Sequence, residues 1–389
     1  MSQITFSKQE LERYSRHLII PEFNIEGQRK LKGARVLVVG TGGLGAPLLQ
    51  YLTAAGVGTI GIVDFDIVDE SNLQRQVLFT VDDIGKPKVE VAKQRLEKLN
   101  PHLTFRTYNT HLNASNALEI IKDFDVVADG TDNFPTRYLV NDACVILGKV
   151  NVYASIFRFE GQASVFNYLY ADGSRGPNYR DLFPVPPPPG LVPSCAEGGV
   201  LGVLPGILGS LQANEVIKVI TGVGETLAGR LFLFDAAGFT TRILRIAKDQ
   251  TAKAITQLID YEEFCGIPQQ VMADESQSGA RQNGVREVTV QQLAQLITSG
   301  ADFDLIDVRE PYEYDIVNIN GRLIPKGEIK DHVDEISRQR QVVVHCRSGK
   351  RSADVVRELQ DKYGFENLYN LKGGVLAWAK EIDHSLPVY

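Results

Sequence analysis

The sequence Val36-Leu-Val-Val-Gly-Thr-Gly-Gly-Leu-Gly-Ala-Pro-Leu-Leu-Gln50 decides the fold of the first half of the chain. It begins as an apolar strand, passes through the glycine cluster Gly40-Thr-Gly-Gly-Leu-Gly45 and continues as a helical pattern. Glycines at this junction let the backbone approach phosphate groups at a helix N-terminus. Asp64 ends the next apolar run, where a carboxylate meets a ribose hydroxyl in dinucleotide-binding sheets. The stretch therefore predicts a parallel α/β sheet that binds a nucleotide at one edge.

Strand-like apolar runs alternate with amphipathic helical patterns along the rest of the chain. These runs occupy residues 34–39, 59–63, 125–128, 304–308 and 341–345. The alternation is typical of parallel sheets with crossover helices. Residues 266–284 are rich in small polar residues and lack apolar periodicity, which indicates a linker. We therefore expect a first domain over residues 1–265, a linker over 266–285 and a second α/β domain over 286–389.

The composition places the chain among ordinary globular proteins and limits the classes of partner that it is expected to bind. Its 389 residues exceed the length at which a single core stops growing, so two domains are expected. A net charge of -7 argues against a broad electrostatic grip on nucleic acid or on anionic membranes. The N-terminal residues lack an export pattern, and no apolar run is long enough to cross a bilayer. Four scattered cysteines suit reduced thiols, so we expect a cytoplasmic protein.

The residues beyond the glycine cluster bear on two kinds of nucleotide site. A glycine-rich loop followed by an acidic residue also describes an NAD-dependent dehydrogenase. Activating a carboxylate with ATP instead brings two anions together, so the site needs cations for the phosphates and a carboxylate for Mg²⁺. Arg75 and Lys88 could neutralise the triphosphate, and Asp132 could hold Mg²⁺. Each of them taken alone is equally consistent with a charge on a helix surface.

Three further segments carry a resemblance to a known family: Glu12-Arg-Tyr-Ser-Arg-His17, Ser71-Asn-Leu-Gln-Arg75 and Pro193-Ser-Cys-Ala-Glu-Gly-Gly-Val-Leu-Gly202. With the glycine cluster, they make residues 8–248 similar to the MoeB/ThiF family, the bacterial relatives of ubiquitin-activating enzymes. The resemblance implies an α/β fold with a Rossmann-like mixed sheet and helices on both faces. It also implies that the chain adenylates a C-terminal glycine carboxylate.

The same resemblance implies roles for particular residues. Arg75 and Arg16 would be catalytic, with Arg16 supplied by the other subunit of a homodimer. Asp132 would hold Mg²⁺. ATP would be bound by a larger set: Gly40, Gly42, Gly43, Asp64, Ser71, Asn72, Arg75, Lys88, Asp132 and Asn133.

One departure from the family concerns zinc. Members often carry a structural zinc held by two Cys-x-x-Cys pairs, and such a closed site needs four ligands at close spacing. Here Asn178 and Asp181 stand where the first pair would be, and Cys265 is alone near the position of the second. We therefore predict no zinc, with packing stabilising that corner instead.

The stretch Val342-Val-Val-His-Cys-Arg-Ser-Gly-Lys-Arg-Ser352 is the second one that carries chemistry. We interpret it as a buried strand, a six-residue loop from Cys346 to Arg351, and a helix capped by Ser352. Backbone amides, the positive end of a helix and basic side chains all favour an anionic sulfur in such a loop. Cys346 is therefore predicted to be a reactive thiolate. The remaining loop residues are Arg347, Ser348, Gly349, Lys350 and Arg351.

Loop length distinguishes two families that use such a cysteine. Protein phosphatases have one more residue, so that an arginine grips the phosphate at the position occupied here by Ser352. The shorter loop, with Leu305-Ile-Asp-Val-Arg-Glu310 and Leu371-Lys-Gly-Gly-Val-Leu-Ala-Trp378, is similar to the rhodanese domain across residues 286–389. This resemblance implies a second, smaller α/β domain in which Cys346 carries a persulfide.

Several other reactive or polar residues are interpreted as structural. Asp307 and Arg309 are expected to be structural residues, and Trp378 is expected in the core. His345 ends an apolar strand, so it is interpreted as a hydrogen-bonded packing residue rather than a base. Cys144 is expected to be a buried helix residue.

Cys195 is the exception among the other cysteines. It follows a proline-rich run over residues 183–190, which is interpreted as a stiff surface loop or as the frame of an entrance for an extended peptide. Cys195 could be a second nucleophile that forms an acyl or disulfide intermediate. A packing role is the alternative.

The two resemblances combine into one predicted reaction sequence. ATP converts the C-terminal glycine of a small ubiquitin-like sulfur carrier, ending in Gly-Gly, into an acyl-adenylate. The Cys346 persulfide, loaded by a cysteine desulfurase or from thiosulfate, then replaces AMP with sulfur. The fused arrangement resembles the bifunctional enzymes of molybdopterin biosynthesis, and thiamine, cysteine and tRNA thiolation use related chemistry. Three alternatives stay open: an NAD-binding oxidoreductase with an appended sulfurtransferase, a phosphatase tail, and a non-enzymatic scaffold.

Overall fold

The structure, a computed structural model, describes residues 4–188, 198–266 and 284–388. The chain divides into two units, Met1–Gln270 and Val271–Tyr389. The predicted linker over residues 266–285 lies almost entirely outside the described ranges. None of the described helices is long and apolar enough to cross a membrane.

The first unit is built on an eight-stranded mixed sheet with the order β3-β2-β1-β4-β5-β6-β7-β8. Its strands are β1 (Arg35–Val39), β2 (Thr59–Val63), β3 (Thr104–Tyr108), β4 (Val126–Asp129), β5 (Val150–Phe157), β6 (Glu160–Phe166), β7 (Arg230–Asp235) and β8 (Thr240–Arg245). The strands from β3 to β5 in this order are parallel, and β6 to β8 extend the sheet antiparallel. The strands predicted at residues 34–39, 59–63 and 125–128 agree with β1, β2 and β4 to within one residue.

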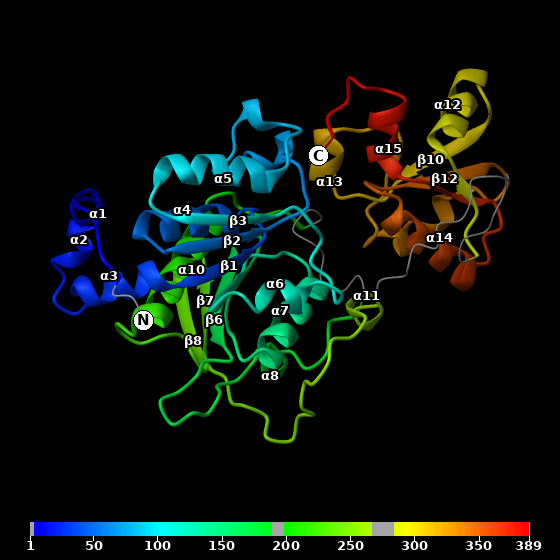
Figure 1. The fold of residues 1–389 in the computed structure, drawn as a ribbon. Helices are drawn as coiled ribbons and strands as arrows, with labels where there is room; N and C mark the ends of the chain where they lie inside the picture. Colours follow the sequence, from blue (N-terminus) through cyan, green and yellow to red (C-terminus); the bar gives the residue numbers. More distant parts are fainter. Residues whose placement is uncertain (1–3, 189–197, 267–283, 389) are drawn as a thin grey trace. The chain divides into compact units, whose positions relative to one another are not determined.

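Helices cover both faces of this sheet, which confirms the predicted mixed α/β class (Figure 1). They are α1 (Lys8–Arg13), α2 (Ser15–Leu18), α3 (Asn24–Gly33), α4 (Gly45–Ala55), α5 (Lys88–Leu99), α6 (Ala117–Ile121), α7 (Phe134–Ile146), α8 (Tyr179–Leu182), α10 (Leu204–Thr221) and α11 (Tyr261–Phe264), with the 3-10 turns η1 (Glu70–Asn72) and η2 (Val81–Asp83). Alternate residues of a strand point to opposite faces. Val36 and Val38 therefore pack with α4, α5 and α10, whereas Leu37 and Val39 pack with α6 and α7.

The strand order reverses between β1 and β4, and doubly wound sheets bind their ligands at such a point. Because β2 and β4 both pair in parallel with β1, the carboxyl ends of the three strands meet at one edge. Gly40 leaves β1 with a φ of +89°, which L side chains rarely adopt. A Cβ at Gly45 would lie 2.0 Å from the Gly40 carbonyl oxygen. The tight turn from strand to helix therefore requires glycine at both ends of the cluster.

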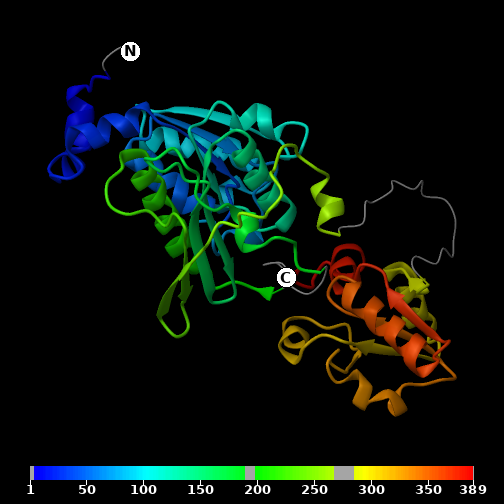
Figure 2. The ribbon, with the colours of Figure 1, turned by 90° about the horizontal axis from the view of Figure 1, so that it is seen from below.

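The second unit has a parallel five-stranded sheet with the order β11-β10-β12-β13-β9. Its elements are β9 (Glu287–Val288), α12 (Val290–Ser299), β10 (Phe303–Asp307), α13 (Pro311–Ile316), β11 (Arg322–Leu323), η3 (Ile329–Asp331), η4 (Val333–Glu335), β12 (Gln341–His345), α14 (Lys350–Tyr363), β13 (Leu368–Leu371) and α15 (Gly374–Glu381). Val342 and Val344 of β12 pack with α14, whereas Val343 packs with α12 and α15. Figure 2 shows α14, in orange, alongside this sheet. The strands predicted at residues 304–308 and 341–345 correspond to β10 and β12.

Candidate functional site

A cavity of about 390 Å³ opens at the carboxyl ends of β1, β2 and β4. Its volume lies in the range of small-molecule sites. Nine of the residues predicted to bind ATP line it: Gly40, Gly42, Gly43, Asp64, Asn72, Arg75, Lys88, Asp132 and Asn133. These residues come from separate segments, so the strand order brings them together.

Asp64 organises the glycine loop as well as lining the cavity. Its Oδ2 accepts hydrogen bonds from the Thr41 amide at 2.8 Å and from the Thr41 hydroxyl at 2.7 Å. Its Oδ1 accepts a hydrogen bond from the Asp66 amide at 2.9 Å. The carboxylate at the end of β2 thus fixes the loop that leaves β1, and its predicted contact with a ribose stays a prediction.

The two predicted cations reach the cavity from different elements. Lys88 begins α5, and its buried side chain pairs through Nζ with Oδ2 of Asp66 at 2.9 Å. Arg75 follows η1 and donates from Nη1 to the Ser71 carbonyl at 3.0 Å. Both cations are therefore held by protein acceptors before any phosphate arrives, which reduces the reorganisation that substrate binding requires.

The charges around the cavity favour a divalent cation beside a triphosphate. The lining includes three cationic side chains and four carboxylates: Arg75, Lys88, Arg137, Asp64, Asp66, Asp69 and Asp132. Because carboxylates outnumber cations, a triphosphate needs further positive charge there. Proteins usually hold Mg²⁺ through one or two carboxylates together with substrate phosphates, and the exposed Asp132 offers such a ligand. These residues fit Mg²⁺ bound with ATP, and the described residues contain no group of three or more His, Cys, Asp or Glu that could hold a metal by itself.

Arg137 is a site residue that the sequence reasoning missed. It lies on α7, is 7% exposed, and lines the cavity. Its Nη2 donates to the Thr131 carbonyl at 3.1 Å, whereas its Nε has no partner among the described residues. The neighbouring Asp129 is fully buried, and burial raises the pKa of its carboxyl group. The available signal was an arginine one helical turn after Asn133, at the mouth of a predicted phosphate site.

Some predicted residues lie elsewhere or have a second role. Ser71 is exposed and does not line the cavity, and its hydroxyl bonds within its own turn, to Asp69. Asn133 lines the cavity and also caps α7 through its side-chain oxygen. Arg16 is exposed on α2 and does not line the cavity of its own chain. Cys195 lies outside the described residues.

The second candidate site is the loop that follows β12. Cys346 is 1% exposed, and its Sγ accepts a hydrogen bond from the Gly349 amide at 3.2 Å. Gly349 has a φ of +89° and is the N-cap of α14, which begins at Lys350. The predicted cap at Ser352 is therefore wrong, because the left-handed glycine starts the helix earlier and leaves Ser352 inside its first turn.

The start of α15 supports this loop from one side. The Cys346 and Arg347 carbonyls accept hydrogen bonds from the Val375 and Leu376 amides, both at 3.0 Å. A Cβ at Gly374 would lie 2.4 Å from the Cys346 carbonyl oxygen. The glycine pair of the predicted rhodanese motif thus allows the helix end to approach the loop backbone.

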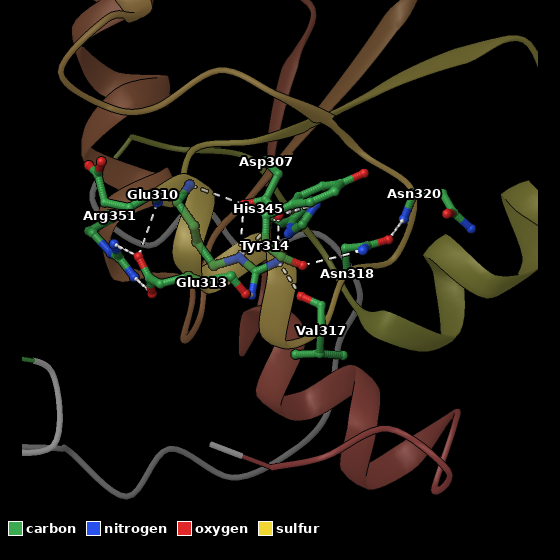
Figure 3. A network of polar contacts seen from close by, with 10 residues as sticks. Asp307, Glu310, Glu313, Tyr314, Val317, Asn318, Asn320, His345 and Arg351 are labelled. Atoms are coloured by element: carbon green, nitrogen blue, oxygen red, sulfur yellow. Dashed lines mark hydrogen bonds and ion pairs between the residues drawn. The ribbon is translucent and has the colours of Figure 1, made fainter. Parts of the chain in front are cut away.

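A polar network connects the end of this loop, at Arg351, to α13 (Figure 3). Arg351 donates two hydrogen bonds, of 2.7 and 2.6 Å, to the Glu313 carboxylate on α13. Arg309 and Asp307 form a fully buried ion pair, and Arg309 also donates to the carbonyls of Glu313 and Val317 at 3.2 and 2.8 Å. Asp307 and Arg309 are therefore structural, as predicted, and the structure adds that they hold α13 against the sheet.

His345 is buried, but the ring hydrogen bond expected for it is not found among the described residues. Neither ring nitrogen has a hydrogen-bond partner among the described residues, and Nε2 lies 3.8 Å from Oδ2 of Asp307. Burial lowers its pKa to about 4, so the ring is neutral at physiological pH. Cys144 is fully buried in α7, and the partly buried Trp378 packs against the core, as expected.

The corner where a zinc was considered is held by polar contacts as well as by packing. Asn178 caps α8, and Asp181 closes its capping box. Arg180 donates two hydrogen bonds of 2.8 Å to the buried Asp142, and the Tyr261 hydroxyl donates to the same carboxylate at 2.8 Å. This buried carboxylate ties α7, α8 and α11 together.

Comparison with known proteins assigns the first unit. A model of the ThiF family matches residues 14–254. The chain belongs to the ThiF family. A model of the rhodanese-like domain matches residues 289–381, so a sulfurtransferase domain follows in the same chain.

The relatives of this ThiF-family chain are named for both activities or for adenylation alone. It is 50% identical over 386 residues to the probable adenylyltransferase/sulfurtransferase MoeZ of Mycobacterium tuberculosis, with 98% of this chain and 96% of that protein covered. It is 52% identical over 268 residues to the sulfur carrier protein adenylyltransferase of Thermus thermophilus, with 67% and 99% covered. A crystal structure of E. coli MccB with MccA-N7isoASN matches 65% of this chain and 76% of that one, with a TM-score of 0.56 and 24% identity, and shows the shared fold. The ThiF-family chain is therefore an ATP-dependent adenylyltransferase and a sulfurtransferase.

Proposed function

We propose that the first unit uses ATP to adenylate the C-terminal glycine of a small ubiquitin-like sulfur carrier. Cys346 then delivers sulfur, as a persulfide, to the activated carboxylate. The observation that carries this proposal is the presence of two sites in one chain. One is a cavity with a glycine loop and three cations, and the other is a buried cysteine whose Sγ accepts a hydrogen bond from a loop amide. The printed name of the Thermus relative supports a sulfur carrier as the substrate.

The residues of the cavity suit the first step. A carboxylate oxygen of the carrier attacks the α-phosphorus of ATP, and the bond to pyrophosphate breaks. Arg75, Lys88 and Arg137 neutralise the phosphate charge that otherwise repels the carboxylate. Mg²⁺, when bound at Asp132, supplies the positive charge that the lining lacks and stabilises the leaving pyrophosphate. The glycine loop offers backbone amides to the phosphates.

The second step exchanges AMP for sulfur. The outer sulfur of the Cys346 persulfide attacks the acyl carbon and AMP leaves. Cys195 is the proposed second thiol: it attacks Sγ of Cys346, the thiocarboxylate leaves, and an external thiol reduces the resulting disulfide. A cysteine desulfurase or thiosulfate reloads Cys346. We propose molybdopterin biosynthesis in the cytoplasm as the setting, with thiamine, cysteine or tRNA thiolation as the alternatives, and a homodimer in which Arg16 serves the partner's cavity.

Two half-reactions test the proposal separately. ATP-pyrophosphate exchange, dependent on a carrier ending in Gly-Gly, reports adenylation, and mass spectrometry reports the replacement of one carrier oxygen by sulfur. We expect Lys88→Ala to lower exchange by at least about a hundredfold and to leave sulfur transfer from thiosulfate to cyanide intact. Cys346→Ala should give the opposite pattern.

Lys86→Ala is the matched control for Lys88→Ala. Lys86 is a neighbouring exposed lysine that does not line the cavity, so exchange should persist in this variant. Absence of exchange with every Gly-Gly carrier tried would reject the adenylation of a sulfur carrier.

A further inference from the structure

Ser352 does not cap α14, and its position beside the reacting sulfur needs another explanation. Its side chain is fully buried, and its Oγ lies 3.4 Å from Sγ of Cys346. The Gly349 amide lies 3.2 Å from the same sulfur. Sγ therefore has two hydrogen-bond donors in reach, one from the loop backbone and one from this hydroxyl.

The Ser352 hydroxyl has one proton and three acceptors to choose from. Oγ lies 2.6 Å from Oδ1 of Asn370, 3.2 Å from the Gly349 carbonyl and 3.4 Å from Sγ. Asn370 is 2% exposed, and its Nδ2 donates to Glu287 across the pair of β13 and β9 at 3.2 Å. That bond orients the amide so that its oxygen faces Ser352.

The charge on the sulfur decides which acceptor takes the proton. A neutral thiol or a sulfur bonded to a second sulfur is a weak acceptor, so the hydroxyl turns to Asn370. A thiolate is a strong acceptor, because hydrogen bonds to ionised groups are about twice as strong as those between neutral ones. Water has little access to Cys346, which is 1% exposed, so the loop itself must stabilise a charge there.

We propose that Ser352 is a catalytic residue of sulfur transfer, whose hydroxyl stabilises the Cys346 thiolate as the persulfide gives up its outer sulfur. The inference rests on the proposed persulfide role of Cys346. In loading, Sγ attacks the outer sulfur of thiosulfate, the sulfur-sulfur bond of thiosulfate breaks, and sulfite leaves with the electron pair. In discharge to a nucleophilic acceptor such as cyanide, the acceptor attacks the outer sulfur, the bond from Sγ breaks, and the electron pair stays on Sγ. In the proposed transfer to the carrier, Sγ regains the electron pair when the external thiol reduces its disulfide with Cys195.

Charge returns to Sγ only in discharge, so Ser352 acts chiefly on that step. In loading, the same hydrogen bond stabilises the attacking thiolate and lowers its nucleophilicity, so its loss does not slow the attack once the cysteine is ionised. A purely structural residue would slow both steps together. The ratio of the two rates therefore separates a catalytic role from a structural one.

The experiment measures both half-reactions on the full chain. Thiosulfate loads Cys346, and mass spectrometry follows the persulfide. Cyanide then discharges it, and thiocyanate is measured. The loading rates of the wild type and the variants are compared at a pH high enough that each rate has stopped rising with pH. We expect Ser352→Ala to slow discharge about tenfold, the rate equivalent of one hydrogen bond to a charged group, and to change loading by less than about twofold.

Two further comparisons guard against a misfolded variant. Thr and Val have nearly the same shape, so Ser352→Thr should discharge faster than Ser352→Val by a similar factor of about ten. Asn370→Leu removes the competing acceptor and leaves the hydroxyl to the sulfur, so discharge should stay within about threefold of the wild type. Circular dichroism checks the fold of each variant.

Three results would overturn the inference. The first is equal discharge by the Thr and Val variants, and the second is an equal slowing of loading and discharge in Ser352→Ala. A wild-type chain that takes up no sulfur at Cys346 would instead reject the proposed persulfide role itself. Loss of discharge in Asn370→Leu as large as in Ser352→Ala would show that the pair only supports the loop, and would also overturn the inference.

Discussion

At the scale of single residues, each site holds one of its cations in an ion pair with a nearby carboxylate. Lys88 pairs with Asp66 in the first unit, and Arg351 pairs with Glu313 in the second. Glu313 is 8% exposed on its side chain, and burial alone would raise its pKa. The hydrogen bonds from Arg351 and from the Glu310 amide outweigh burial, so the pKa of Glu313 is lowered. The folded state therefore favours the charged carboxylate.

Glu313→Gln should destabilise the second unit in a pH-dependent way. Because the folded pKa is lowered, the stabilisation is present above the pKa of unfolded glutamate and is lost as the pH falls through the folded pKa. We expect the variant to lose about 2 kcal/mol in its free energy of unfolding at pH 7, and the difference to shrink below about pH 4. Trp378 is the only tryptophan of the chain, so its fluorescence follows this unit alone in the intact protein.

Asp354→Asn is the matched control for that measurement. Asp354 pairs with Lys326, and both side chains are substantially exposed, so the loss should stay below about 1 kcal/mol. A pH-independent difference between wild type and Glu313→Gln would contradict the proposed contribution of the charged carboxylate.

At the scale of elements, the start of α15 fixes the backbone of the loop that contains Cys346. Gly374 has a φ of +58°, and its Cα faces the carbonyl oxygens of Cys346 and Arg347. Added bulk at this position must push the loop away from the helix end. The glycine motif that ends in Trp378 thus acts on the site through backbone spacing.

Gly374→Ala should abolish most sulfur transfer and leave adenylation unchanged. A Cβ would lie 2.4 and 2.6 Å from the two carbonyl oxygens, and the positive φ adds strain, so we expect a loss of at least about 2 kcal/mol in stability. Gly364→Ala is the control, because Gly364 has a φ of +68° with no other atom within 4 Å of the added Cβ. It should cost about 1 kcal/mol and keep sulfur transfer. Equal sulfur transfer by both variants would argue against the role of the close contact.

At the scale of the whole molecule, the adenylation site is proposed to need two copies of the chain. Arg16 is exposed on α2 and does not line its own cavity, whereas Arg75 does. If Arg16 serves the partner's cavity, one cavity then depends on residues from two chains. The ATP-pyrophosphate exchange of mixed variants measures this dependence directly.

Arg16→Ala and Arg75→Ala should each abolish exchange alone and restore it when the two chains are refolded together. In a mixed dimer, one cavity combines an intact Arg75 with an intact Arg16 from the other subunit. Random pairing places such a cavity in about a quarter of all sites, so about a quarter of wild-type exchange should return. Two Arg75→Ala chains carrying different tags provide the control. If the mixture recovers no exchange, then either both arginines serve the cavity of their own chain or they do not take part in catalysis.

The sequence by itself determined the features that depend only on residues adjacent along the chain. The turn at Gly40 and Gly45 and the loop at Cys346 each lie between a strand and the helix that follows it, and Asp64 comes directly after a strand. Local sterics and helix ends operate over a few residues, so their signals are visible along the chain. The strands next to these loops were located to within one residue for the same reason.

Only the tertiary structure decided which distant side chains complete the sites. Arg137 reaches the cavity because β4 lies beside β1, and Ser352 meets Asn370 because β13 lies beside β12. The wrong helix cap at Ser352 has the same origin, since a serine before a helical pattern signals a cap unless the backbone has already turned at Gly349. Which side chains are buried and which pair with each other depends on strand order and on contacts between segments far apart in the sequence. These contacts cannot be read from the residues next to each side chain along the chain.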